Sequence, residues 1–153
     1  FNEYRNSKLK SKLILCGTGD LKKDILKKIE EYGLTNDVII LENQSNMNEI
    51  YQVFDLFLFP SLFEGLPFAL IEAQAAGIPC LISDTISKEI CITDLVHYES
   101  LDKSEIVWAK KLHSLDNKVK VNTLYSIEKA GYDISSCRKN FYNAINYNSL
   151  EDN

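Results

Sequence analysis

Two glutamates, Glu64 and Glu72, stand eight residues apart around the start of a predicted helix, and these side chains are the best placed for chemistry. Glu64 and Gly65 follow an apolar run, and the helix begins at about Leu66. The free N–H groups at a helix N-terminus bind anions, and glycine lets a ligand approach the backbone closely. A carboxylate beside such a site would repel a phosphate, but it can accept hydrogen bonds from sugar hydroxyls.

Glu72 lies within a helical stretch, 70–76, that is otherwise mostly apolar. A carboxylate in such a setting needs a polar partner, and the 2′ and 3′ hydroxyls of a ribose would serve. On physical grounds alone a second interpretation stays open, in which Glu64 caps the helix and Glu72 faces solvent. The two glutamates therefore indicate either a nucleotide-sugar site or an ordinary helix start.

A second candidate is the turn Gly17-Thr18-Gly19, which follows an apolar run. Glu42 ends the next apolar run, about where a ribose-binding carboxylate of a dinucleotide fold would stand. The dinucleotide fingerprint needs a third glycine three residues after Gly19, but Lys22 occupies that position. The match is partial, and a tight turn that leads into a helix is the simpler interpretation.

Short apolar runs alternate with helical patterns along the chain. We expect strands at 12–16, 38–41, 56–59, 80–83 and 95–98. We expect helices at about 20–33, 48–53, 66–77, 104–115, 124–130 and 135–147, and residues 1–5 resemble the end of another. In the first full helix Asp20 should be the N-cap and Gly33 the stop. This alternation predicts a Rossmann-like, doubly wound parallel sheet with helices on both faces.

In such a fold ligands bind beyond the carboxyl ends of the strands. The loops at 17–20, 42–47, 60–67 and 83–89 should therefore meet at one edge of the sheet. Both candidate motifs fall within these loops.

Length and composition describe one ordinary globular domain. The 153 residues are 45% hydrophobic and 25% charged, which excludes a disordered chain and a disulfide scaffold. No apolar run approaches the ~18 residues of a membrane span. The net charge of −5 argues against a nucleic-acid partner. The four cysteines lack zinc-ligand spacing.

The segment around the two glutamates resembles the E-x7-E motif of the retaining glycosyltransferases of family 4, which have the GT-B fold. The resemblance extends over Phe54–Ser61 and over Gly77-Ile78-Pro79, and the stretch 70–89 as a whole is similar to bacterial enzymes that build capsular and extracellular polysaccharides. Gly131 to Ile134 also resembles the turn before their last helix. The resemblance implies the C-terminal, donor-binding half of a GT-B enzyme.

The family's roles can be carried onto matching residues. Glu64 would contact hydroxyls of the donor hexose, and it is the residue we name as catalytic. Gly65, Leu66 and Phe68 would offer backbone N–H groups to the sugar and the diphosphate. Glu72 would hold the ribose.

The resemblance also implies donor contacts from the earlier loops. Glu42, Asn43 and Gln44 would lie near the base. Gly17 and Gly19 would line the cleft that faces the other domain.

The resemblance implies an enzyme that moves a hexose from a nucleotide diphosphate, expected to be UDP, to a glycan or lipid-linked acceptor in polysaccharide biosynthesis. The family's acceptor domain, the first strand of the donor domain, and the Arg and Lys after that strand have no counterpart here. Between Phe59 and Cys80 there is no Lys or Arg at all. We therefore expect residues 1–153 to form one nucleotide-sugar-binding domain that is inactive alone.

The partners implied are a nucleotide sugar and, through the absent domain, the acceptor; no metal and no other cofactor is expected. The expected location is cytoplasmic, with peripheral contact at the inner face of the bacterial membrane as an option. Two other classes stay open. One is the NAD-binding half of an oxidoreductase, favoured by Gly17, Gly19 and Glu42 but opposed by Lys22. The other is a non-catalytic Rossmann-like interaction module.

Overall fold

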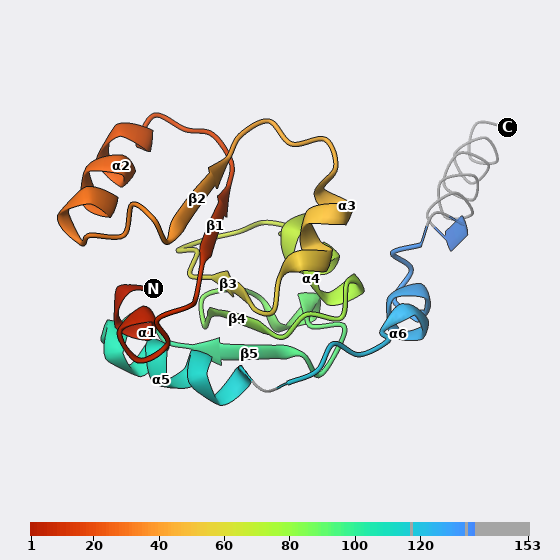
Figure 1. Ribbon diagram of the computed structural model, residues 1–153. Coiled ribbons are helices and arrows are strands. Elements are labelled where there is room, and N and C mark those ends of the chain that lie inside the picture. The colour runs from red at the N-terminus through yellow and green to blue at the C-terminus, as the bar shows by residue number, and fades with distance from the viewer. Residues whose placement is uncertain (117, 134, 137–153) are drawn as a thin grey trace, which may run out of the picture.

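The computed structural model describes residues 1–116, 118–133, 135 and 136 (Figure 1). Its strands are β1 (Leu13–Cys16), β2 (Val38–Leu41), β3 (Phe57–Phe59), β4 (Cys80–Ser83) and β5 (Val96–Glu99). Its helices are α1 (Asn2–Ser7), α2 (Lys22–Glu31), α3 (Met47–Ile50), α4 (Phe68–Ala75), α5 (Glu105–Leu115) and α6 (Leu124–Lys129), with 3₁₀ turns at Tyr51–Val53 and Lys88–Ile90. The helix predicted at 135–147 lies outside the described residues, apart from its first two.

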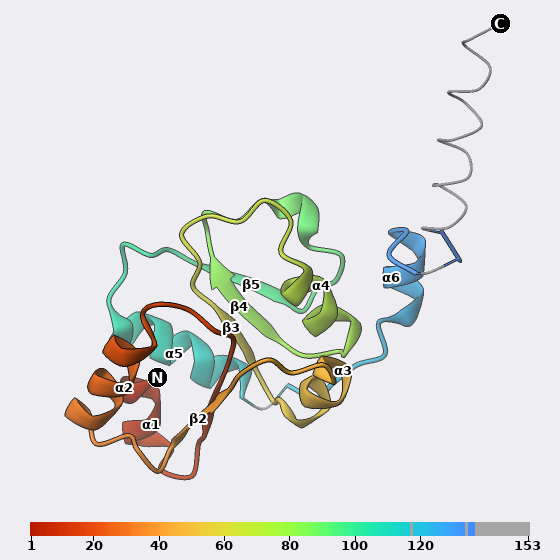
Figure 2. The ribbon, with the colours of Figure 1, turned by 90° about the horizontal axis from the view of Figure 1, so that it is seen from above.

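The described strands form two parallel sheets instead of the single sheet that the sequence predicted. One sheet has the order β1-β2, and the other has the order β3-β4-β5 (Figure 2). Leu13 pairs with Val38 in the first sheet, and Leu81 pairs with both Leu58 and His97 in the second. Among the described residues no strand pairs with the free edge of β1 or of β3.

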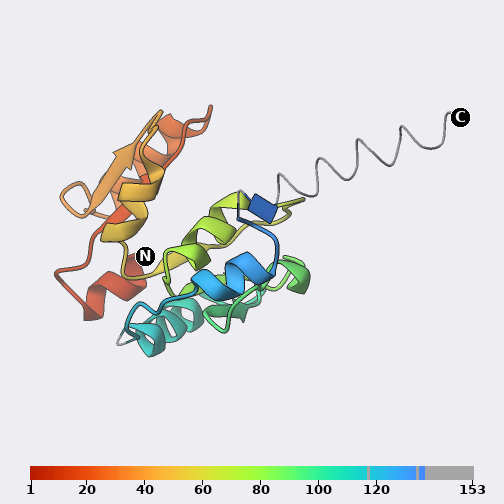
Figure 3. The same ribbon diagram turned by 90° about the vertical axis from the view of Figure 1, so that its right-hand side faces the viewer.

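Helices cover both faces of the three-stranded sheet, as predicted. On one face α4 contributes Leu70, Ile71 and Ala73, which pack with Cys80 and Ile82 of β4. On the other face α1 and α5 pack around Leu81, and Figure 1 shows α4 and α5 on opposite sides of this sheet. Every residue of β4 is buried, so the core is centred on this strand. Helix α6 lies beside α4 (Figure 3).

Helix α2 differs from its prediction in two respects. Its N-cap is Leu21 and not Asp20, because the Leu21 carbonyl accepts the first helical hydrogen bond, from the Ile25 N–H at 3.0 Å. None of its residues is buried, since the sheet beside it has only two strands. Gly33 ends the helical segment as predicted, at a φ of 64° that glycine adopts without strain.

Helix α1 is joined to α5 by polar contacts on Asp116. The Lys8 Nζ lies 2.8 Å from one carboxylate oxygen, the Tyr4 hydroxyl donates to the other, and His113 Nδ1 lies 3.3 Å from the same oxygen as Lys8. Partial burial opposes ionisation of Asp116, but the bonds from Lys8, Tyr4 and His113 outweigh it and hold the pKa of Asp116 below its usual value. Within the described ranges no helix is long and apolar enough to cross a membrane.

Candidate functional site

The start of α4 offers backbone donors at the carboxyl end of β3. Pro67 is the N-cap, and no side chain caps the helix. The N–H groups of Gly65, Leu66 and Ala69 have no hydrogen-bond partner among the described residues. The Phe68 N–H instead donates to the Leu66 carbonyl at 3.0 Å, so the ligand contact predicted for it would require that bond to break.

Glu64 lies in the loop between β3 and α4 and is partly buried. Its Oε1 accepts a hydrogen bond from the Ser61 hydroxyl at 2.8 Å. Glu64 therefore does not cap α4, so this half of the second interpretation is wrong, whereas its other half, a Glu72 that faces solvent, is confirmed. The Ser61 carbonyl in turn accepts hydrogen bonds from the hydroxyls of Ser83 and Thr85, the latter at 3.0 Å. These bonds join the loop after β3 to the loop after β4.

A cavity of about 120 Å³ opens where these two loops meet. Its near wall is the segment Glu64–Pro67, and its far wall comes from the loop after β4. The far wall and floor consist of Ile86, Ser87, Glu89, Ile90 and Tyr132. Two carboxylates and no Lys or Arg stand among these lining residues. We call this cavity the α4 pocket; it suits a neutral ligand that donates hydrogen bonds.

Glu72 is exposed on α4 and does not line the α4 pocket. Its neighbour is Tyr51, whose hydroxyl donates to the Ala69 carbonyl at 3.1 Å. Burial, and then the nearby Glu72 carboxylate, raise the pKa of Tyr51 above its usual value. The structure thus leaves Glu72 accessible, with a phenol beside it.

The predicted residues of the first two loops line a separate cavity of about 540 Å³ between α2 and the β1-β2 sheet. Gly17, Gly19 and Glu42 belong to it. Glu42 Oε2 lies 2.6 Å from the Lys22 Nζ, so a side chain of the protein already engages this carboxylate. We call this cavity the α2 pocket.

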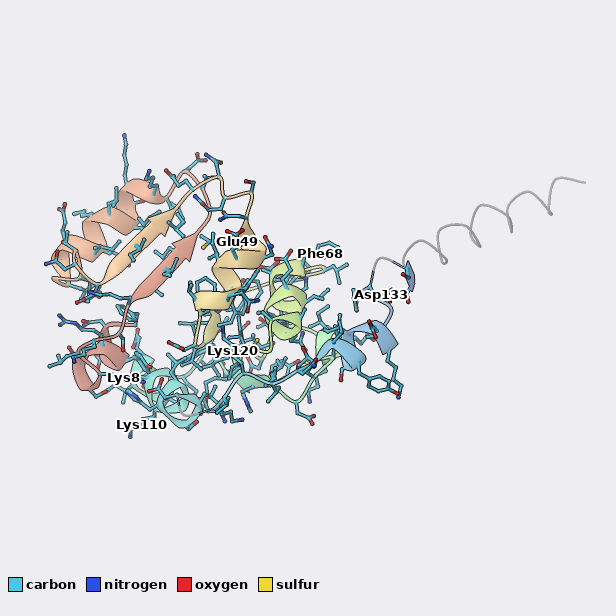
Figure 4. All side chains as sticks on the ribbon, turned by 45° about the vertical axis from the view of Figure 1, so that its right-hand side comes forward. Lys8, Glu49, Phe68, Lys110, Lys120 and Asp133 are labelled. Carbon is cyan, nitrogen blue, oxygen red and sulfur yellow. The ribbon has the colours of Figure 1, made fainter. Side chains whose placement is uncertain are left out.

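Asn43 and Gln44, expected near the base, line neither pocket. Asn43 has a φ of 52°, and the Gln44 amide donates to the Glu42 carbonyl at 2.8 Å. The predicted site residues are therefore divided between two pockets and the surface outside them. Phe68 is among those outside, and 63% of the residue's surface is exposed. Figure 4 shows it on α4.

The sequence did not indicate which residues form the far wall of the α4 pocket. It pointed to the loop at 83–89, but it gave no role to Glu89 or Ile90. Tyr132 also lines the pocket. Among the residues that the structure describes, no group of His, Cys, Asp and Glu could hold a metal ion.

Comparison with known proteins gives a consistent result. The family described as "Glycosyl transferases group 1" matches residues 2–97. The chain is 38% identical over 105 residues to EpsF of Bacillus subtilis (strain 168), a glycosyltransferase by name; the match covers 68% of this chain and 27% of that protein. It is 32% identical over 75 residues to the UDP-Gal:alpha-D-GlcNAc-diphosphoundecaprenol alpha-1,3-galactosyltransferase of Escherichia coli, covering 48% of this chain and 19% of that enzyme.

Two solved structures share the fold. The pneumococcal O-GlcNAc transferase GtfA in complex with UDP and GlcNAc matches 84% of this chain and 28% of its own, with a TM-score of 0.65 at 16% identity. WaaG, a glycosyltransferase involved in lipopolysaccharide biosynthesis, matches 84% of this chain and 49% of its own, with a TM-score of 0.52 at 15% identity. Because the family match at 2–97 covers more than half of the chain, the protein belongs to the glycosyl transferases of group 1, and its Rossmann-like α/β fold is of the predicted GT-B type.

Proposed function

We propose that this chain is the donor-binding part of a retaining glycosyltransferase that moves a hexose from UDP to a glycan or lipid-linked acceptor in polysaccharide biosynthesis. The observation that carries the proposal is the α4 pocket, where Glu64, Gly65 and Leu66 share one wall and the N–H groups of these two neighbours of Glu64 have no partner among the described residues. The UDP and GlcNAc named for GtfA, and the UDP-Gal donor named for the E. coli relative, support a nucleotide-sugar ligand.

The α4 pocket has the size and polarity for one sugar ring. Its volume of about 120 Å³ is smaller than the ~300–1,000 Å³ of pockets that enclose a whole drug-sized ligand. Glu64 keeps its Oε2 free of partners within the described residues, so this oxygen can accept a bond from a sugar hydroxyl. The carboxylate then orients the sugar and does not act as one of the paired acid and nucleophile groups of a glycosidase.

The start of α4 would serve the diphosphate. The N–H groups of Gly65, Leu66 and Ala69 are donors that can stabilise negative charge as the leaving group departs. Glu72, the fifth residue of α4, would accept hydrogen bonds from the ribose hydroxyls. This scheme needs no metal ion and no cofactor besides the donor itself.

We also propose that a further parallel strand lies between β1 and β3 in the working enzyme. A doubly wound sheet has the strand order 3-2-1-4-5-6. The described strands supply two parts of this order: β2-β1 corresponds to 3-2, and β3-β4-β5 corresponds to 4-5-6. The strand numbered 1, which would lie between β1 and β3, is the one that these two parts leave out. The resemblance places an Arg and a Lys after that strand, and these would supply the positive charge that the lining of the α4 pocket lacks.

The chain spans 27% of EpsF and 19% of the E. coli transferase. We propose that residues 1–153 form one donor-binding domain and that a second domain holds the acceptor. We place the enzyme in the bacterial cytoplasm, without a nucleic-acid partner, and peripheral contact with the inner membrane face would bring it to a lipid-linked acceptor.

Isothermal titration with UDP, GDP, NAD, UDP-galactose and UDP-N-acetylglucosamine tests the donor class. Without the basic side chains we expect dissociation constants of about 1 mM for UDP and its sugars, which corresponds to roughly −4 kcal/mol. Binding of NAD alone would overturn the proposal. If every ligand fails, the titration is repeated on a longer chain that contains the further strand, and failure there would also refute it.

A further inference from the structure

Gln74 is an amide side chain at the centre of the apolar core. It lies in the last turn of α4 and has no exposed surface (0%). Its Nε2 donates to the Leu70 carbonyl at 3.2 Å and to the Ile90 carbonyl at 3.0 Å. Burial of an unpaired amide is costly in proteins, so a polar side chain is retained here only with such partners.

The oxygen of the same amide binds the segment that follows Ile90. Gln74 Oε1 accepts hydrogen bonds from the Ile92 N–H at 2.9 Å, from the Thr93 N–H at 3.1 Å and from the Thr93 hydroxyl at 3.1 Å. Residues 91–95 lie between the 3₁₀ turn at Lys88–Ile90 and strand β5, outside any helix or sheet. One buried side chain therefore makes four hydrogen bonds to the stretch 90–93.

This stretch continues directly from the far wall of the α4 pocket, to which Ile90 itself belongs. The near wall, Glu64–Pro67, leads into the same helix that carries Gln74. Gln74 thus connects the two walls: its backbone is part of α4, and its side chain holds the end of the opposite loop.

We propose that Gln74 is a positioning residue that fixes the width of the α4 pocket and thereby the binding of the donor sugar. The inference rests on the proposed function, because it takes the α4 pocket to be the sugar site. Gln74 touches neither sugar nor nucleotide in this scheme. It acts through Ile90 and the loop before it. Apart from Gln74, that loop is held by the core contacts of Ile86 and Ile90, by the bond from Thr85 to the Ser61 carbonyl, and by the bond from Tyr98 to the Ser87 carbonyl.

Gln74→Met tests this role, since methionine has a similar length and no hydrogen-bonding amide. The matched control is Thr123→Val. The Thr123 hydroxyl is also buried and bonds the end of α4, donating to the Gln74 carbonyl at 2.7 Å, but Thr123 lines neither wall of the pocket. Both variants lose buried hydrogen bonds of α4, and only Gln74→Met frees the stretch 90–93.

The readouts are amide hydrogen exchange and titration with UDP-galactose and UDP. For Gln74→Met we expect exchange at Ile92 and Thr93 to rise by about tenfold or more, and UDP-galactose binding to weaken by about tenfold, as for the loss of one or two buried hydrogen bonds. Binding of UDP should change by less than about twofold, because UDP carries no hexose. Thr123→Val should leave both the exchange at 92–93 and the ratio of the two affinities unchanged.

Three results would overturn the proposal. Equal losses for UDP and UDP-galactose would show that Gln74 only stabilises the fold, and unchanged exchange at 92–93 would show that it does not anchor the wall. If the wild-type chain bound neither ligand, even with the further strand, the proposed function would fail as well. Should Gln74→Met not fold, Thr93→Val removes one bond to the same oxygen, and it must show the same pattern at smaller amplitude.

Discussion

Gly77 ends α4 at a point where another segment of the chain crosses it. Its φ is 72°, and a Cβ added there would lie 2.1 Å from the Val121 carbonyl oxygen. The Val121 N–H also donates to the Gly77 carbonyl at 3.3 Å, so the crossing backbone is held in place. Gly77→Ala should therefore destabilise the fold through both strain and overlap.

Gly33 separates these two contributions. It has a similar φ of 64° at the end of α2, but an added Cβ would meet nothing within 4 Å. Gly33→Ala should cost only the left-handed strain, about 1–2 kcal/mol. Gly77→Ala adds an overpacking cost of about 1–3 kcal/mol, which gives a total of about 2–5 kcal/mol.

Urea unfolding followed by circular dichroism measures the difference. With an m-value of about 2 kcal/mol/M, the midpoint should fall by about 1–2.5 M for Gly77→Ala and by about 0.5–1 M for Gly33→Ala. Equal midpoints for the two variants would refute the reasoning, because the contact between Gly77 and Val121 would then carry no cost.

Three further predictions concern single side chains. The pKa of Asp116 is lowered in the folded state, so the free energy of unfolding should fall as the pH drops below about 4. Asp116→Asn should reduce this fall, as measured by the urea midpoint at each pH. If the variant lost stability in acid as steeply as the wild type, that would count against the ion pair. Burial raises the pKa of the Cys80 thiol to about 12, so at pH 8 iodoacetamide should alkylate the exposed Cys16 well before Cys80. Mass spectrometry measures the two rates, and equal rates would contradict the burial of Cys80. Glu72→Ala should weaken UDP and UDP-hexose by the same factor in a titration, since both carry the ribose, and a loss confined to UDP-hexose would remove its assigned role.

Much of the fold follows from local pattern. Strands β2 and β4 have the bounds that the sequence predicted, because each is a continuous apolar run with turn residues beside it. Gly33 and Gly77 end their helical segments with positive φ, as glycine after a helix should. Each of these features depends on a few consecutive residues, so the local hydrophobic pattern is enough to predict it.

The features that could not be predicted depend on residues far apart in the chain. The pair of Lys22 and Glu42 joins α2 to the end of β2, and no sequence rule gave the distance between them. The split into two sheets depends on which strand lies beside β1. The hydrophobic pattern could not predict this, because it does not show which strands pair with each other. Gln74 gave a signal that was overlooked: an amide within an apolar helical run needs buried partners, just as Glu72 was argued to need one.

The bond from Ser61 to Glu64 shows why the site itself was only partly predictable. The spacing of Glu64 and Glu72 directed attention to the start of α4. The conformation of the loop decided that Glu64 accepts from Ser61 and does not cap the helix. Loop conformation in turn depends on Ser83 and Thr85, more than twenty residues later.

The central claim is that Glu64 binds the sugar part of a nucleotide sugar in the α4 pocket. The most direct measurement is titration of the wild type, Glu64→Ala and the control Glu30→Ala, an exposed carboxylate on α2, with UDP and a UDP-hexose. Glu64→Ala should weaken the UDP-hexose by about tenfold, as for the loss of a hydrogen bond to a charged group, and leave UDP nearly unchanged. Glu30→Ala should alter neither affinity. An equal loss of both ligands in Glu64→Ala, or no loss of either, would contradict the account.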